Sequence, residues 1–192
     1  MSTQPIPIFT AEQYLELERK SEFRSEFIKG GIYAMSGGTR NHALVMMNAA
    51  AALHQQLKGK PCSVVSSDMR IHSRTFGIYT YPDVVVTCGP DQFLDERKDV
   101  LTDATLIVEV LSPSTQSYDR GEKFLYYRSL PSFQEYLILW QTEIRAEHHV
   151  KQPDGSWLFR EHMQPETEIN LSSIGCQVIL ADLYDRVVLE SA

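Results

Sequence analysis

The sequence predicts an α/β domain with a mixed central β-sheet and helices on its faces. Three observations indicate this class: a long amphipathic helix at residues 41–58, β-branched runs in the middle of the chain, and a series of strands towards the C-terminal end. A chain of 192 residues is long enough to bury roughly 70% of its unfolded surface in one core. We therefore expect a single domain over residues 1–192.

The N-terminal part predicts a helix, a hairpin and a second helix. Thr10 can cap a first helix over residues 11–20, and Gln13 can complete a capping box. Residues 27–35 contain two short apolar segments around a pair of glycines, which is typical of two strands joined by a turn. The helix at residues 41–58 has an apolar residue at every fourth position and is followed by Gly and Pro stop signals.

The middle of the chain predicts the central sheet. Its segments are rich in β-branched residues, and the runs of consecutive apolar residues indicate strands that are buried on both faces. A helix is predicted over residues 118–130, where Pro131 ends it, and strands with turns are predicted from residue 143 to residue 189. The predicted central strands are residues 62–67, 79–87, 104–111 and 134–140.

Composition and charge exclude several classes of protein. With 18 basic and 25 acidic residues the formal charge is −7, which argues against a general nucleic-acid coat protein but not against a nuclease with a carboxylate site. The sequence has no signal peptide and no apolar stretch long enough to span a membrane, so we expect a cytoplasmic protein. Cys62, Cys88 and Cys176 are widely spaced and odd in number, which predicts three reduced thiols and no structural zinc site.

Three ionisable residues are expected to meet at the central sheet. Asp83 begins one predicted strand, Glu109 lies inside the next, and Lys123 belongs to the following helix. A carboxylate flanked by apolar residues, as Glu109 is, is costly to bury unless it meets a cation or hydrogen-bond donors. If both carboxylates point to the same side, a hard cation such as Mg²⁺ or Mn²⁺ between them would relieve their repulsion.

Structural roles for the same residues are also compatible with the sequence. Asp83 can simply belong to a Pro-Asp turn that enters a strand, and Glu109 can pair with Arg120 at a sheet edge. Lys123 can face solvent and pair with Asp119 at the favourable spacing of four residues.

Several segments of the chain resemble one known family. The segments that carry the resemblance are Tyr81-Pro-Asp-Val-Val-Val86, Leu106-Ile-Val-Glu-Val-Leu-Ser-Pro-Ser-Thr115 and Asp119-Arg-Gly-Glu-Lys-Phe124. They are similar to blocks of the Uma-two family, which is placed among restriction endonucleases in the PD-(D/E)XK nuclease superfamily. The resemblance covers almost the whole chain and implies a restriction-endonuclease-like core with extra C-terminal strands.

The resemblance also implies a site and an activity. Asp83 and Glu109 would be the metal carboxylates, Glu26 an acidic residue from the N-terminal region, and Lys123 a displaced motif lysine, because Leu111 stands where the motif has Lys. The expected activity is Mg²⁺- or Mn²⁺-dependent hydrolysis of DNA phosphodiester bonds. The backbone carbonyl of Val110 is a further expected metal ligand.

Two other functions are compatible with the same residues. A non-catalytic interaction or nucleic-acid-binding domain on the nuclease scaffold would explain Leu111 and the net acidity, and a hydrolase of other phosphoesters is a third alternative.

A homodimer is expected, because cleavage of both DNA strands is simplest with two symmetry-related sites and the C-terminal strands offer an edge. His42, near the start of a predicted helix, can approach the site, but a surface or packing role is expected. The neighbouring pair His148 and His149 is expected at the surface, on opposite faces of a strand.

Overall fold

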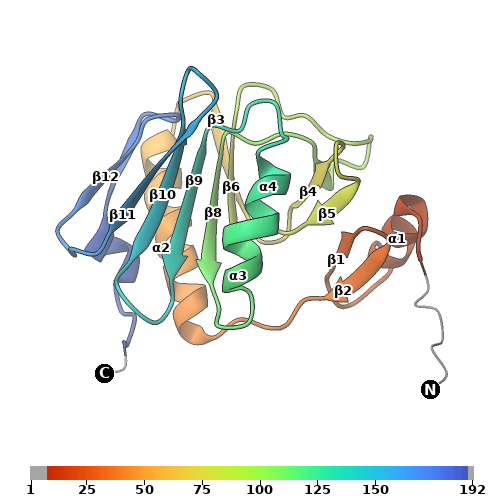
Figure 1. The fold of residues 1–192 in the computed structure, drawn as a ribbon, viewed down its shortest axis with the longest axis horizontal. Coiled ribbons are helices and arrows are strands. Elements are labelled where there is room, and N and C mark those ends of the chain that lie inside the picture. Colours follow the sequence, from red (N-terminus) through yellow and green to blue (C-terminus); the bar gives the residue numbers. More distant parts are fainter. Residues whose placement is uncertain (1–7, 190–192) are drawn as a thin grey trace.

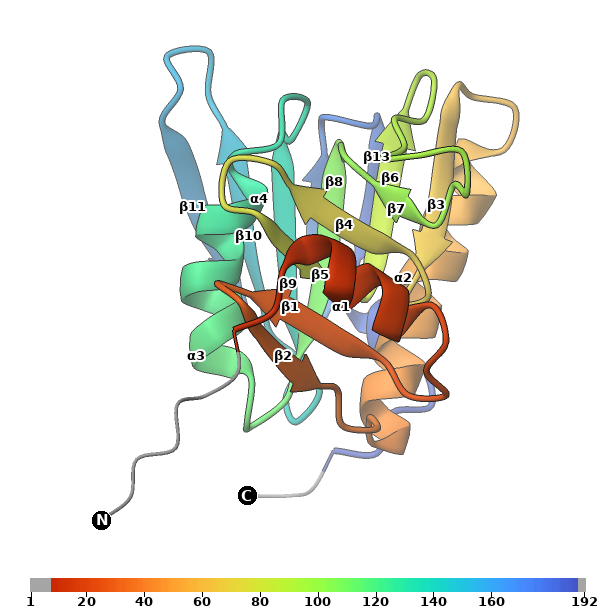
Figure 2. The same cartoon turned by 90° about the vertical axis from the view of Figure 1, so that its right-hand side faces the viewer.

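The protein consists of two β-sheets, a separate hairpin and helices that cover both faces of the larger sheet (Figure 1). The structure is a computed structural model and describes residues 8–189. A view at right angles shows the N-terminal helix and the smaller sheet in front of the larger one (Figure 2). This arrangement confirms the predicted α/β class.

The larger sheet has six strands in the order β11-β10-β9-β8-β6-β3. Only β8 and β9 run parallel among its described pairs, and the other neighbours are antiparallel, so the sheet is mixed as predicted. Every residue of β8 is buried, because helices cover both faces of this central strand. The strands are β3 (Cys62–Ser66), β6 (Val84–Cys88), β8 (Leu106–Leu111), β9 (Glu135–Trp140), β10 (Ala146–Lys151) and β11 (Trp157–His162).

The smaller sheet has five strands in the order β2-β1-β5-β4-β7. The prediction of one strand over residues 79–87 was wrong, because β5 ends at Thr80 and β6 begins at Val84 in the other sheet. Pro82 lies between them and has no N–H with which to continue a ladder. The strands are β1 (Ser25–Ile28), β2 (Gly31–Ala34), β4 (Arg70–Ser73), β5 (Ile78–Thr80) and β7 (Val100–Leu101).

Helix α2 (Arg40–Leu57) covers one face of the larger sheet. Its buried residues are the four apolar ones at intervals of four, Val45, Ala49, Leu53 and Leu57. They pack against alternate residues of β6 and β8, including Val84 and Val108, in the largest core cluster. The hairpin of β12 (Glu168–Leu171) and β13 (Cys176–Ile179), followed by the 3₁₀-helix η2 (Leu180–Tyr184), closes this side.

A second helix covers the opposite face. It consists of α3 (Gln116–Tyr118), the π-helical turn η1 (Asp119–Lys123) and α4 (Phe124–Tyr127), and it packs over the other set of alternate strand residues, including Val85 and Ile107. Helix α1 (Ala11–Glu18) begins with the predicted capping box of Thr10 and Gln13 and packs on the smaller sheet. The three helices pack on the faces of the sheets and not on the junction between the two sheets, where polar side chains gather.

Two cysteines form a disulfide that the sequence did not predict. Cys62 of β3 lies directly opposite Cys88 of β6 in the antiparallel register, with their Cα atoms 4.1 Å apart, and the two sulfurs are bonded. Cys176 is a buried free thiol. The expectation of three reduced thiols was wrong for two of them, because strand pairing brings together residues that are 26 positions apart in sequence.

His148 also lies elsewhere than expected. The two histidines do face opposite sides of β10, but His148 is only 2% exposed and its Nε2 lies 2.9 Å from the Glu135 carboxylate. His149 packs on the Phe124 ring. The prediction of a surface pair was therefore wrong for His148, because β10 is an interior strand of the sheet rather than its edge.

No helix within residues 8–189 is long and apolar enough to cross a membrane.

Candidate active site

Asp83 and Glu109 meet where β6 and β8 lie side by side. Val84 pairs with Val108 in the antiparallel register, which puts Asp83 opposite Glu109. The N–H of Val110 donates to Asp83 Oδ2 at 2.7 Å, and the N–H of Asp83 donates to Glu109 Oε2 at 3.4 Å. Asp83 does belong to a turn that enters a strand, but its carboxylate faces the neighbouring strand instead of solvent.

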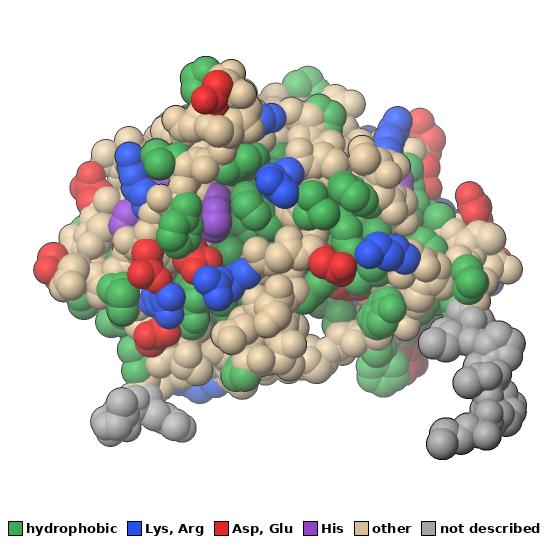
Figure 3. All heavy atoms as spheres, viewed as in Figure 1, with side chains coloured by type: hydrophobic (Ala, Val, Ile, Leu, Met, Phe, Trp, Pro, Cys, Tyr) green, Lys and Arg blue, Asp and Glu red, His purple; other side chains and the backbone are tan. Residues whose placement is uncertain are grey.

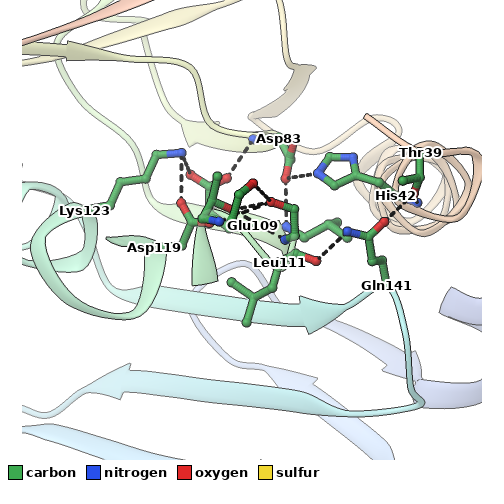
Figure 4. A network of polar contacts seen from close by, with 12 residues as sticks. Thr39, His42, Asp83, Glu109, Leu111, Asp119, Lys123 and Gln141 are labelled. Atoms are coloured by element: carbon green, nitrogen blue, oxygen red, sulfur yellow. Dashed lines mark hydrogen bonds and ion pairs between the residues drawn. The ribbon is translucent and has the colours of Figure 1, made fainter. Parts of the chain in front are cut away.

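Lys123 reaches back to Glu109 from the helix that covers this face (Figure 4). Its Nζ lies 2.8 Å from Glu109 Oε1, 3.4 Å from Asp119 Oδ1 and 3.6 Å from Glu26 Oε1, and the residue is only 6% exposed. The π-helical turn changes the phase of the helix at this point, and such turns are frequent at functional sites. The alternative of a solvent-facing Lys123 was wrong, although the pairing with Asp119 does occur.

Glu26 brings the smaller sheet into the same cluster. It lies on β1, is 9% exposed, and accepts a hydrogen bond from the N–H of Tyr81 at 3.2 Å. Tyr81 belongs to the segment that crosses from the smaller sheet to the larger one and leads directly into Asp83. The structure therefore brings the four side chains that the resemblance implied, Asp83, Glu109, Lys123 and Glu26, to one junction.

Arg120 and Leu111 take no part in this cluster. Arg120 pairs with Glu147, at 2.6 Å, so the expected alternative of an Arg120–Glu109 pair was wrong. Leu111 is 2% exposed and packs in the core beneath the covering helix. The position of the motif lysine is therefore filled by an apolar core residue, and the ammonium group at Glu109 comes from Lys123.

Two residues of the site were not assigned to it from the sequence. The hydroxyl of Tyr127 donates to Glu109 Oε1 at 2.7 Å, and His42 Nε2 lies 3.3 Å from Asp83 Oδ2. The spacing of Asp119, Lys123 and Tyr127 by four residues was the available signal for Tyr127, because it puts all three on one helix face. His42 stands in the first turn of α2, and only the packing of α2 on the sheet brings it to Asp83.

Burial and charge shift the protonation of these groups. Burial raises the pKa of Glu109 well above its usual range, and Asp83 and Asp119 add to this effect while Lys123 opposes it. Burial disfavours the charged form of Lys123, but the carboxylates around it, above all Glu109, outweigh burial and raise its pKa. Burial likewise opposes the charge of His42, yet its bond to Asp83 prevails and raises its pKa. Without a metal, Glu109, Lys123 and His42 therefore all hold their protons to higher pH than they would in water.

The cluster forms the floor of a pocket of about 820 Å³. The pocket lies between the covering helix, the start of α2 and the hairpin β1–β2, and the connection from β2 to α2 borders it. In the space-filling view an opening separates the main body from the N-terminal part near the lower edge of the molecule (Figure 3). The pocket that holds Asp83 and Glu109 is also lined by exposed side chains, such as Phe23 and Tyr33, so it is open to solvent.

The donor set fits a hard divalent cation. Within residues 8–189 Glu109 Oε2 accepts only the long bond from the Asp83 N–H, so it keeps capacity for a further partner. No cluster of three or more His, Cys, Asp or Glu side chains that could enclose a metal ion occurs in this part of the chain. Mg²⁺ is commonly held by one or two carboxylates while it keeps several waters, and the carboxylates of Asp83 and Glu109 and the Val110 carbonyl are oxygen ligands of the kind it takes.

The fold is a nuclease-like α/β fold. A solved structure described as a putative nuclease belonging to DUF820, from Anabaena variabilis, superposes with a TM-score of 0.78 at 16% identity and covers 96% of this chain and 100% of its own. A family model described as Uma2, putative restriction endonuclease, matches residues 11–181. The chain belongs to the Uma2 family.

Two relatives from Synechocystis sp. support this membership. Both are uncharacterized proteins that are 36% identical to this chain. One aligns over 182 residues, 94% of this chain and 93% of its own, and the other over 165 residues, 86% of this chain and 93% of its own.

Replacing Glu109 by Gln is expected to change how stability depends on pH in metal-free protein. The raised pKa means that the folded state holds a proton that the unfolded chain releases near about pH 4.3. This contribution to stability is present below that pH and is lost as pH rises through the folded pKa. Gln keeps the neutral form throughout, so Glu109→Gln should gain stability relative to the wild type as pH rises above about pH 4.3. Urea unfolding with EDTA present measures the free energy of unfolding of both proteins at each pH. If this free energy depends on pH in the same way in the variant and in the wild type, the raised pKa of Glu109 is contradicted.

Proposed function

We propose that this protein is a metal-dependent endonuclease that hydrolyses DNA phosphodiester bonds. The observation that carries the proposal is the meeting of two strand-borne carboxylates, Asp83 and Glu109, with the ammonium group of Lys123 at the floor of an open pocket. Membership of a family described as restriction endonucleases supports the same reaction class. The choice of DNA as the substrate rests on this likeness.

Mg²⁺ or Mn²⁺ would be held by Asp83, Glu109 and the carbonyl of Val110. When bound, it would polarise a phosphate oxygen and lower the pKa of an attacking water. The Val110 N–H and His42 orient the Asp83 carboxylate, and the Tyr127 hydroxyl orients Glu109. Lys123, held among three carboxylates, presents a fixed positive charge where negative charge develops on the phosphate.

The rival of a non-catalytic domain loses its main argument. It relied on Leu111 in place of the motif lysine, but Lys123 brings an ammonium group to 2.8 Å from Glu109. Incubation of labelled single-stranded, duplex and branched DNA with Mg²⁺, Mn²⁺ or EDTA separates the two. Metal-dependent cleavage supports the endonuclease, and the absence of any turnover with either metal would favour the non-catalytic domain. Metal-dependent turnover of small phosphoesters without DNA cleavage would instead favour a different phosphoester hydrolase.

Mn²⁺ is expected to raise the melting temperature of the wild type, and Asp83→Asn should abolish most of this increase. A metal that binds only the folded state stabilises it by mass action, by about 2.7 kcal/mol at a concentration about 100 times its Kd. Differential scanning fluorimetry with and without Mn²⁺ measures the change. Glu96→Gln is the matched control, because it removes an exposed carboxylate from the β6–β7 connection. An undiminished shift in Asp83→Asn would exclude Asp83 as a principal ligand.

Lys123→Met should reduce DNA cleavage by roughly 10²-fold or more, the scale for removing one preorganised charge. The variant should also lose about 3–5 kcal/mol of stability without metal, because it leaves buried carboxylates unpaired. Lys123→Arg keeps the charge and serves as the folded comparison, with rates normalised to the folded fraction from circular dichroism. A wild-type rate in Lys123→Met would remove Lys123 from the mechanism.

We further propose a homodimer. The strand β11 ends the larger sheet, and Leu158 and Phe159 on it are 39% and 50% exposed, so its edge is available for pairing with a second copy. Light scattering at micromolar concentration is expected to give twice the chain mass, and a monomeric mass there would contradict the proposal.

A further inference from the structure

Exposed apolar side chains gather at the mouth of the pocket. Phe23 is 77% exposed, Tyr33 57% and Met35 37%, and all three line the same pocket as Asp83 and Glu109. We call these three residues the rim. Large exposed aromatic side chains beside a polar site are unusual on a free surface and are typical of surfaces that bind a ligand.

Tyr33 is directed to the candidate active site by strand pairing. It lies opposite Glu26 in the β1–β2 register, and cross-strand partners project from the same face of a sheet. Its ring lies over Gly31, where an added Cβ would come within 2.8–3.0 Å of the ring and hydroxyl atoms. The absence of a side chain at residue 31 therefore allows Tyr33 to lie flat along β2, with one ring face available beside Glu26.

The reacting groups lie below the surface of the pocket. Glu109 is 3% exposed, Lys123 6% and the Asp83 side chain 14%, whereas the rim residues stand in solvent. In a regularly stacked duplex each phosphate is held on the outer surface of a wide and stiff double helix, which limits how far it can descend below the rim. A nucleotide that is unpaired or turned out of the stack can enter alone, as it does in enzymes that act on extruded bases.

The charge of the lining indicates that the backbone phosphates are not the main source of affinity. Six carboxylates line the pocket, namely Glu22, Glu26, Asp83, Glu109, Asp119 and Glu122. Its two Lys and Arg side chains are both paired, Arg24 with Asp68 and Lys123 with carboxylates of the floor. Sequence-independent attraction of phosphates needs several available cationic groups, so binding must draw on another interaction. Stacking of bases on aromatic rings supplies one.

We propose, on the basis of the function proposed above, that the substrate is unpaired DNA whose bases stack on Phe23 and Tyr33. A single-stranded segment lies along the rim, and the phosphate beside a stacked nucleotide descends to Asp83 and Glu109. The preference for unpaired DNA comes from the rim, whereas hydrolysis comes from the floor, so the two can be separated by substitution.

The test compares binding of a short fluorescein-labelled oligothymidylate and of a labelled blunt-ended duplex without unpaired nucleotides, measured by fluorescence anisotropy with Ca²⁺ in place of Mg²⁺. The wild type should bind the single strand more tightly than the duplex. Phe23→Ala and Tyr33→Ala should each weaken single-strand binding by roughly 5-fold to 150-fold, the effect of one base–ring stack. Phe76→Ala is the matched control, because it removes a partly exposed ring from the β4–β5 connection, away from the pocket lining and from the proposed dimer edge, and it should leave the affinity unchanged.

Two further measurements sharpen the test. Gly31→Ala keeps the Tyr33 ring but displaces it, and it should weaken single-strand binding as Tyr33→Ala does. The slope of log affinity against log salt concentration should not exceed about 1.4 in magnitude, the value for two phosphate contacts on a single strand.

The outcomes separate this inference from the proposed function. If duplex is bound and cleaved as well as single strands, and if the rim variants behave like Phe76→Ala, the rim has no role and the endonuclease proposal stands. If the wild type neither binds nor cleaves any DNA with any of the metals, both proposals are wrong. Thermal melting of each variant confirms that the exposed substitutions leave the fold intact.

Discussion

The buried ammonium group of Lys123 is the interaction on which the arrangement of this protein depends. It contacts carboxylates from three separate elements, Glu109 on β8, Asp119 in its own helix and Glu26 on β1. A buried charge without partners is strongly destabilising, so these elements are held in one relative position by the need to pair it. The larger sheet, its covering helix and the smaller sheet thus meet at a single side chain.

The segment from Tyr81 to Asp83 links this cluster to the course of the backbone. At its start, the Tyr81 N–H donates to Glu26 of the smaller sheet at 3.2 Å, and the Tyr81 hydroxyl donates to Glu18 of helix α1 at 2.8 Å. Its end presents Asp83 to the larger sheet, where the Val110 N–H holds the carboxylate. Because so short a segment joins the two sheets at this point, a shift of one sheet against the other would move Asp83 away from Glu109. The candidate site is therefore a consequence of how the sheets dock.

The sequence predicted what local pattern determines and missed what tertiary pairing determines. The α2 helix follows from its apolar spacing, and Glu109 was singled out because a carboxylate within an apolar strand requires a partner. The strand expected over residues 79–87 was wrong, since each half is β-like and only pairing assigns the halves to different sheets. The approach of Lys123 to Glu109 was expected from its place in the helix after β8 and is confirmed, whereas the π-helical turn that carries Lys123 has no sequence signature. Likewise, no local pattern indicates that the His42 ring faces Asp83, because the two residues lie on elements far apart in the chain.

The electrostatics of the pocket reconcile an acidic protein with the chemistry proposed for it. A net charge of −7 argues against a protein that coats phosphates, because such binding draws on many exposed cationic groups. In this pocket the fixed cation, Lys123, is buried and paired, so it contributes little to attracting DNA from solution. Its effect is greatest on charge that develops next to it, where solvent is excluded and the field is weakly screened. Affinity and catalysis would then come from different residues, which is why an acidic surface is compatible with a nuclease site.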